Sequence, residues 1–362
     1  MPTEERLVAP RAKGSSVARI PNAWYVACAS SDLGRDKPIS RTILGLPIVL
    51  FRGDGGAPGA LLDRCPHRNV PLSLGRVTKQ GRLECGYHGW RFDRGGRCLE
   101  VPSLCGPGEA RSRDAEAFGC VERDGFVWVW PEVGVEPAGE PFRFPFLGKP
   151  GYTSVSEHVV AEASVHAVAE NALDVPHTAF AHAGLFRSDD RARNRVEVIV
   201  RRWADRVEAE YVGEPRPEGL VGRVLSPKGG VVKHWDRFIL PSIVQVEYEL
   251  DAAHIQVSAA LTPESDYRTH LYAVVSFKLP VPGWPLVPVL KPIAFAIFNQ
   301  DAKILKRQTE VIHRFGGESY VSTEIDVLGP HILRLLRAAE QGKVDPSIDA
   351  EAPKEKRFQM DV

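Results

Sequence analysis

The chain has 362 residues, of which 43% are apolar and 25% charged, and its formal net charge is zero. This composition is ordinary for a globular protein with one large domain or two smaller ones. The balanced charge provides no basic field for nucleic acid, so we expect no nucleic-acid partner. All six cysteines precede residue 121, which is too sparse for a secreted disulfide scaffold and predicts a cytoplasmic protein with one cysteine-using site.

Residues 1–20 mix acidic and basic side chains without an apolar core, so they lack a secretory signal pattern and predict a flexible arm. Over residues 21–132, apolar runs such as 47–52 and 125–130 alternate with glycine-rich turns and predict a small antiparallel β domain. Residues 133–152 are rich in proline and glycine and are expected to form a linker.

Residues 153–342 predict a second domain with helices and strands. A helical pattern over about 159–183 precedes several runs of period-two alternation, which are typical of half-buried strands in one antiparallel sheet. These runs are 195–202, 206–212, 242–250, 255–262 and 271–279. A late helix is expected over 298–315.

Residues 279–298 are the most apolar part of the chain. They contain five prolines, which excludes a regular membrane-spanning helix and favours an apolar loop that leads into the late helix. We therefore expect no transmembrane segment. Residues 343–362 are charged and are predicted to be a mobile tail.

Two short segments each carry one cysteine and one histidine. Cys65 and His67 stand two apart, Cys85 and His88 stand three apart, and seventeen residues separate the two pairs. Finger-type zinc sites usually pair Cys with Cys and His with His, whereas this order suits a two-iron cluster between two loops. One iron would take both thiolates and the other both imidazoles. A zinc site or unrelated core residues remain the alternatives.

This pattern resembles the Rieske [2Fe-2S] motif, with "YHGW" attached to the second pair. Pro66 would stiffen the first loop, and Gly75, Gly86 and Gly89 would let the backbone approach the sulfurs. Many Rieske proteins have proline where this chain has Gly86, a departure that touches no ligand. The resemblance implies a [2Fe-2S] cluster as cofactor.

A second motif lies in residues 169–184. Asn171, Asp174 and His177 follow at steps of three and would share one side of a helix. His182 stands five beyond His177, about 140° away on an ideal helix, so a shared metal requires a bend near Pro176. The alternative is a helix with two solvated histidines and a capping aspartate.

Together the two motifs resemble the Rieske non-haem iron oxygenases, from about residue 23 to 340. The resemblance implies an α+β fold, with an N-terminal all-β Rieske domain and a C-terminal helix-grip (START-like) catalytic domain around an antiparallel sheet. It also implies mononuclear Fe(II) bound by His177, His182 and a later carboxylate. Asp301 matches best, because the family places this ligand on a late helix. The other candidates are Glu310, Glu324 and Asp326, and Asp301 itself could be a helix-capping residue.

The resemblance assigns Asp174 and Asn171 to the catalytic machinery. In the family, an aspartate at the position of Asp174 bonds the first iron histidine and a Rieske histidine of a neighbouring subunit, here His88 or His67. This head-to-tail contact must close into a ring, which implies a homotrimer.

The resemblance implies an oxygenase of the homomeric demethylase-like group that uses O2. The chain has no glycine-rich dinucleotide fingerprint, so electrons would come from a separate NAD(P)H-dependent reductase, with or without a ferredoxin. The expected reaction is hydroxylation or oxidative demethylation of a hydrophobic, polycyclic or sterol-like substrate. The alternatives are an O-demethylase or ring hydroxylase of a small aromatic acid, and a Rieske electron carrier without oxygenase activity.

Overall fold

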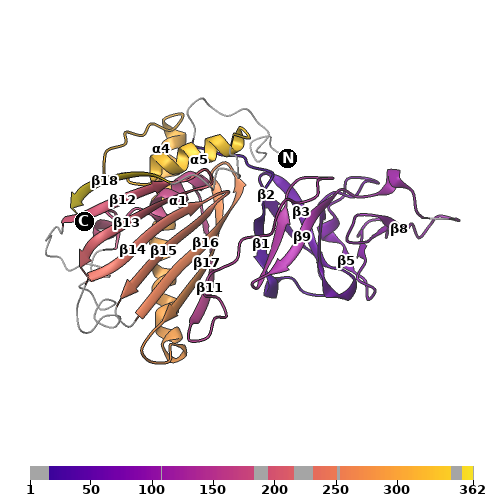
Figure 1. Cartoon of the computed structure of the whole chain (residues 1–362). Helices are drawn as coiled ribbons and strands as arrows, with labels where there is room; N and C mark the ends of the chain where they lie inside the picture. Colours follow the sequence, from indigo (N-terminus) through magenta and orange to yellow (C-terminus); the bar gives the residue numbers. More distant parts are fainter. Residues whose placement is uncertain are drawn as a thin grey trace. The chain divides into compact units, whose positions relative to one another are not determined.

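The computed structural model describes residues 16–106, 108–182, 195–215, 231–250, 253–343 and 353–361. It divides into two compact units, one formed by Pro21–Arg143 and one by the described residues from Phe144 onward together with residues 16–20 (Figure 1). The first unit is built of strands, and the second combines a large antiparallel sheet with helices. The predicted α+β class is therefore confirmed.

The first unit contains an antiparallel sheet in the order β1-β10-β9-β4-β3-β2. Its strands are β1 Tyr25–Ala29, β2 Ile39–Ile43, β3 Leu46–Arg52, β4 Pro58–Leu62, β9 Ala117–Arg123 and β10 Phe126–Trp130. β10 is buried along its whole length, because its five residues are all large and apolar. The expected strands at 47–52 and 125–130 are thus present as β3 and β10.

A smaller antiparallel sheet in the same unit follows the order β5-β6-β7-β8. Its strands are β5 Arg76–Val77, β6 Leu83–Glu84, β7 Arg91–Phe92 and β8 Cys98–Glu100. Cys85 and His88 lie in the turn between β6 and β7, and Cys65 and His67 follow β4. The short 3-10 helices of the unit are Ser30–Asp32, Asp54–Gly56, Leu72–Leu74 and Arg111–Arg113.

The second unit is organised around an eight-stranded antiparallel sheet in the order β11-β17-β16-β15-β14-β13-β12-β18. Its strands are β11 Thr153–Ala161, β12 Arg195–Arg202, β13 Arg206–Pro215, β14 Val231–Ile239, β15 Ile243–Leu250, β16 Ala253–Ser265, β17 Arg268–Lys278 and β18 Lys354–Asp361. All five alternating runs predicted from the sequence are strands of this sheet.

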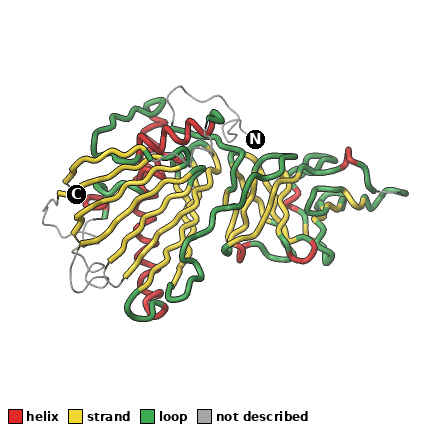
Figure 2. Tube along the Cα trace, in the orientation of Figure 1, coloured by secondary structure: helices red, strands yellow, loops and turns green. Residues whose placement is uncertain are grey.

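Helices lie along one face of this sheet (Figures 1 and 2). They are α1 Val165–Ala172, α2 Thr178–Ala181, α4 Val287–Arg314 and α5 Gly329–Glu340, and the 3-10 turn Trp284–Leu286 precedes α4. Ser164 caps α1, since its side chain accepts a hydrogen bond from the N–H of Ala167 at 3.2 Å. The long α4 packs along β11, where Lys291 pairs with Glu157 at 3.1 Å. This arrangement agrees with the expected helix-grip domain.

The helix boundaries differ from the sequence expectation in two places. The helix expected over 159–183 is split: β11 runs to Ala161, α1 ends at Ala172 and α2 starts at Thr178. The late helix starts at Val287, not near Phe298. Pro288 lies in its first turn, where the backbone nitrogen has no partner within the helix, so proline costs no helical hydrogen bond there. Pro292 is accommodated inside α4. None of the helices in the described segments combines the length and apolarity needed to cross a bilayer.

The two chain ends also differ from the expectation. Residues 16–20 belong to the second unit, and Ser16 is 1% exposed and bonded to Ser164 at 2.9 Å, so this part of the expected arm is buried. Residues 1–15 lie outside the described residues. In the expected tail, β18 pairs with β12, because Phe358 and Met360 alternate with polar residues and place an apolar face beside Val198 and Val196.

Removal of the Met360 side chain tests whether β18 is docked in solution. Met360 is 6% exposed, so Met360→Ala should lower the free energy of unfolding by about 2 kcal/mol. The neighbouring Gln359 is exposed, and Gln359→Ala should change it by less than about 0.5 kcal/mol. Urea unfolding monitored by circular dichroism measures both, and equal stabilities would contradict the docking of β18.

Candidate functional site

The two Cys/His loops of the first unit have the same backbone turn. The carbonyl of Cys65 accepts the N–H of Asn69 at 2.9 Å, and the carbonyl of Cys85 accepts the N–H of Gly89 at 3.0 Å. Each cysteine N–H donates to the carbonyl five residues later, at 2.8 Å in both loops. Asn69 and Gly89 have φ of 61° and 70°, a left-handed conformation that asparagine and glycine adopt most readily. The two loops therefore present their side chains as a matched pair.

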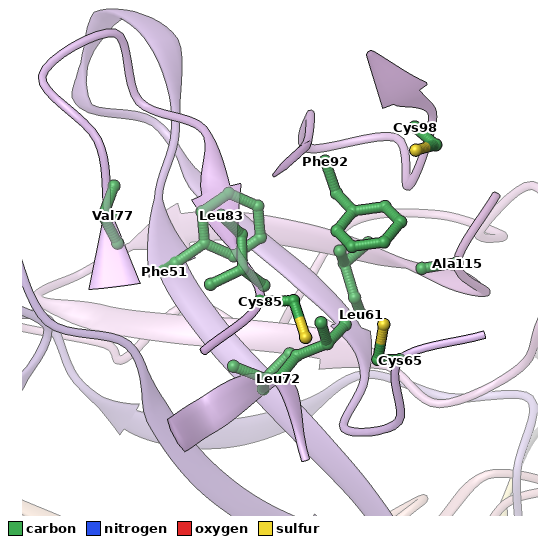
Figure 3. Close-up of a cluster of buried hydrophobic side chains, with 11 residues drawn as sticks. Phe51, Leu61, Cys65, Leu72, Val77, Leu83, Cys85, Phe92, Cys98 and Ala115 are labelled. Carbon is green, nitrogen blue, oxygen red and sulfur yellow. The ribbon is translucent and has the colours of Figure 1, made fainter. Parts of the chain in front are cut away.

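Both cysteines are anchored in the apolar core of the first unit. Cys65 is 2% and Cys85 3% exposed, and they pack with Leu61, Leu72 and Phe92 (Figure 3). Such packing fixes the positions of the two sulfurs and shields them from solvent.

The surroundings of Cys65 suit a sulfur that binds a cation. Burial raises the pKa of its thiol to about 11, the backbone N–H groups of His67 and Arg68 lower it, and the neighbouring thiol of Cys85 raises it. Two adjacent buried thiols ionise with difficulty unless a positive ion lies between them. The amide donors are the groups that stabilise cluster thiolates.

The two histidines complete this arrangement. The rings of His67 and His88 lie 4.7 Å apart between centroids, and His67 stacks on Trp90 at 4.8 Å. Nδ1 of His67 is buried and has no hydrogen-bond partner among the described residues. Desolvation and the nearby Arg68 and His88 lower the pKa of His67, which keeps its ring neutral and able to donate a lone pair. The four residues therefore fit a [2Fe-2S] cluster.

Glycines allow the two loops to meet. A Cβ on Gly75 would lie 1.9 Å from the carbonyl oxygen of Glu84, and one on Gly86 would lie 2.8 Å from that of Leu74. Backbone thus packs against backbone directly beside Cys85, as expected for Gly75 and Gly86.

In the second unit, His177 and His182 flank the single turn of α2, at its N-cap and C-cap. The chain leaves α1 at Ala172 and turns through Asp174 and Pro176, which is the bend that a shared metal requires. The two imidazole rings are 5.3 Å apart between centroids.

Asp301 of α4 meets both histidines. Its Oδ1 lies 3.5 Å from Nε2 of His177 and 3.0 Å from Nε2 of His182, and one ligand atom from each residue falls within 4.8 Å of the others. His177 Nε2 and Asp301 Oδ1 are buried yet make no hydrogen bond within the described structure. Two imidazole nitrogens and a carboxylate oxygen that converge in this way are the donor set that ferrous iron takes in non-haem oxygenases. The residues therefore fit a mononuclear iron.

The electrostatics of this site favour a cation. Burial lowers the pKa of His177, but the carboxylates of Asp301 and Asp174 outweigh burial and raise it. His182 is 2% exposed and Asp301 16%, so water screens these charges weakly. A divalent ion would be held by the same field.

Asp174 adjoins the site on the side of His177. Its backbone carbonyl accepts the Nδ1–H of His177 in a short hydrogen bond, and its carboxylate lies 3.7 Å from the same nitrogen. Asn171, Asp174 and His177 line one cavity of about 420 Å³. Burial raises the pKa of Asp174.

The other acidic candidates lie elsewhere. Glu310 pairs with Arg307 at 2.7 Å, and Glu324 is exposed. Asp326 lines the cavity beside Asp174 and accepts the N–H of Thr323 at 2.6 Å. Among the residues that the structure describes, the group that could hold a metal in the second unit is the one containing Asp301.

Sequence reasoning missed two groups near the site. Glu170 lines the same cavity, and burial, Asp326 and Asp174 raise its pKa to about 7. His234 lies in the sheet between Glu214 at 2.7 Å and Asp236 at 3.0 Å. The first was detectable as the residue preceding Asn171, whereas the second depends on strand pairing and leaves no local pattern.

Two family descriptions match the chain. Residues 23–107 match the Rieske [2Fe-2S] domain, and residues 161–341, half of the chain, match the vanillate O-demethylase oxygenase C-terminal domain. The chain belongs to the Rieske non-haem iron oxygenases. The family's cofactors are the [2Fe-2S] cluster and a mononuclear iron, and both candidate centres have residues that fit them.

Individual relatives agree with this family. The chain is 38% identical over 182 residues to the oxygenase component of dicamba O-demethylase from Stenotrophomonas maltophilia, a match that covers 49% of the chain and 52% of that protein. It is 29% identical over 367 residues to the vanillate O-demethylase oxygenase subunit of Pseudomonas sp. (strain HR199 / DSM 7063), covering 91% and 98%. The match to chlorophyllide a oxygenase of Chlamydomonas reinhardtii is 37% identical over 168 residues, 46% of the chain and 25% of that protein.

The chain thus spans about half the length of the dicamba O-demethylase component and about a quarter of the length of chlorophyllide a oxygenase. Among solved structures, dicamba monooxygenase bound to 3,6-dichlorosalicylic acid superposes with a TM-score of 0.76 at 27% identity, covering 90% of this chain and 99% of that one. The fold of these oxygenases therefore extends over both units of the chain.

The glycine contact between the loops predicts loss of the cluster in Gly75→Ala. The added Cβ would meet the Glu84 carbonyl at 1.9 Å and push the loops apart, so acid-labile sulfide and visible absorption should fall at least severalfold. Gly34→Ala is the control, because a Cβ at Gly34 meets nothing within 4 Å. A variant at Gly75 with a full cluster would show that this approach is unnecessary.

Loss of one ligand should empty the second centre alone. A full complement of a [2Fe-2S] cluster and one mononuclear ion gives about three irons per chain, and Asp301→Ala should reduce this to about two with unchanged cluster absorption. Glu310→Ala on the same helix should keep all three, because Glu310 is exposed and paired with Arg307. Iron analysis decides, and three irons in Asp301→Ala would exclude Asp301 as a ligand.

Proposed function

We propose that this chain is the oxygenase component of a multicomponent system that inserts one oxygen atom of O2 into a hydrophobic ring compound, by hydroxylation or oxidative demethylation. The convergence of His177, His182 and Asp301 carries the proposal, because an electron carrier needs no second metal centre. Bound iron would supply dioxygen activation there, and the [2Fe-2S] cluster would supply single electrons. Overall, substrate, O2, two electrons and two protons give the oxygenated product and water.

The electrons require a partner. The chain has no glycine-rich dinucleotide fingerprint, and the dicamba relative is named as the oxygenase component of its system. A separate NAD(P)H-dependent reductase, with or without a ferredoxin, would reduce the cluster. The six cysteines are free, which suits a reducing compartment, and we place the system in the cytoplasm.

The sheet supports an apolar substrate. Val246, Val257, Val275 and Val155 are paired across four strands and share the face on which Glu157 meets α4. The first three remain partly accessible although helices cover this face, whereas residues pointing the other way, such as Gln256, are buried. The accessible surface beside the helices is therefore aliphatic, and burial of an apolar ring against it is favourable.

An aromatic acid is the second candidate, because a relative's structure contains 3,6-dichlorosalicylic acid. A carboxylate would need an available cation. On the helix-covered face of β14 to β17, the cationic side chain within the described residues is His234, which is fully buried between Glu214 and Asp236. This arrangement favours a neutral substrate. A sterol-like compound gains no support from the relatives.

The surface near Asp174 supports a homotrimer. Asp174 lines a cavity together with Val321 and Ile325, which are 90% and 50% exposed, and Phe180 of the nearby α2 is 80% exposed. Such a patch suits contact with a second copy. Asp174 would then bond His88 or His67 of the adjoining subunit as well as His177, giving electrons a short hydrogen-bonded route.

Conversion of Asp174 to asparagine tests this route. Asp174→Asn should retain about three irons per chain and the visible absorption of the cluster, yet lose turnover by at least about a hundredfold, since the charged acceptor is gone. Asp326→Asn, in the same cavity, should retain most activity. A fully active Asp174→Asn enzyme would exclude the bridge.

The proposed activity itself is tested with the purified chain, a reductase and NADH or NADPH. Neutral aromatic ethers and polycyclic compounds should stimulate O2 uptake and give products with one additional oxygen or one methyl group fewer, and matched aromatic acids should do so less. The Asp301→Ala variant is the control for iron-dependent turnover. An iron-replete chain that accepts electrons but consumes no O2 with any of these compounds would favour the electron-carrier alternative.

A further inference from the structure

A side-chain amide holds one of the candidate iron ligands. Oε1 of Gln300 lies 2.8 Å from Nδ1 of His182. Gln300 directly precedes Asp301 on α4, whereas His182 ends α2, 118 positions earlier in the chain. One helix therefore supplies both the carboxylate of the site and the hydrogen-bond partner of its second histidine.

This contact selects one tautomer of His182. A neutral imidazole has one N–H and one lone pair, and an amide oxygen only accepts. The proton must then be on Nδ1, which leaves the lone pair of Nε2 directed into the site. Consistently, Asp301 Oδ1 accepts no hydrogen bond from the described residues, although Nε2 of His182 is only 3.0 Å away.

A different group fixes the Nδ1–H tautomer of His177. Its Nδ1–H donates to the backbone carbonyl of Asp174, and its Nε2 also faces Asp301 without a hydrogen bond to any residue that the structure describes. Substitution of Asp174 would leave its backbone carbonyl in place, whereas substitution of Gln300 removes the acceptor of His182. An uncharged acceptor also polarises an imidazole less than a carboxylate would. The donor strength of His182 thus depends on the residue at position 300.

We propose that Gln300 is a positioning residue that fixes the tautomer and ring orientation of His182 and links this ligand to Asp301. The inference rests on the proposed function, since it concerns the iron site of the oxygenase. Gln300 would act on the site through His182 and would not itself bind the metal. His182 is 2% exposed, so bulk water could not readily replace this acceptor of its Nδ1–H.

Metal affinity tests the proposal directly. The full chain, with its cluster retained and the mononuclear site stripped by a chelator, is titrated with Co(II) against a chromophoric competitor. Gln300→Leu should weaken binding about tenfold or more, whereas Gln300→Glu, which keeps an acceptor oxygen, should bind at least as tightly as the unaltered chain. Asn299→Ala is the matched control, because Asn299 donates to the Phe295 carbonyl of its own helix, and it should bind like the unaltered chain.

Equal affinities for Gln300→Leu and the unaltered chain would overturn the proposal, as would equal losses in the Leu and Glu variants. Circular dichroism and cluster absorption confirm that each variant is folded.

A second measurement does not depend on metal. In the metal-free chain labelled with 15N-histidine, His182 should give the Nδ1–H tautomer, and Gln300→Leu should shift the ring toward a mixture. An Nε2–H tautomer in the unaltered chain would overturn the proposal. Failure of the unaltered chain to bind Co(II) would instead contradict the proposed function, so the two failures are distinguishable.

Discussion

The approach of one carboxylate to two imidazoles is the constraint on which the chemistry of the second unit depends. Oδ1 of Asp301 lies 3.5 Å and 3.0 Å from the Nε2 atoms of His177 and His182, in a setting where His182 is almost fully buried. These atoms are poor partners for one another without a cation, because lone pairs face a carboxylate. Three features bring these atoms together. The chain bends between α1 and α2, α4 is long, and both α1 and α4 pack on the sheet.

In the first unit, backbone geometry positions the two Cys/His pairs. Cys65 and Cys85 begin identical turns, and the left-handed residues Asn69 and Gly89 occupy equivalent positions in them. Hydrophobic packing then fixes both sulfurs, while the imidazoles lie at the outer side of the loops. Apolar burial thus positions the thiols, and the amides around Cys65 compensate for the cost of charge.

Both charged and apolar side chains are buried in the second unit. Carboxylates gather in one cavity, where burial raises the pKa of Glu170 and Asp174, while the centre of the sheet presents valines beneath the helices. The buried His234 is balanced by two acids and stacked between Tyr211 and Tyr248 at 4.6 and 4.2 Å.

The sequence alone determined the local chemistry: two Cys/His pairs, the Asn171–Asp174–His177 spacing and the period-two strands, because ligand spacing and side-chain alternation are local properties. Tertiary structure decided what depends on distant partners. Of the four candidate acids, Asp301 is the one that meets both histidines, and Gln300 contacts His182. The charged C-terminal segment forms strand β18. Strand pairing and helix docking set these contacts, and no local pattern records which segments will meet.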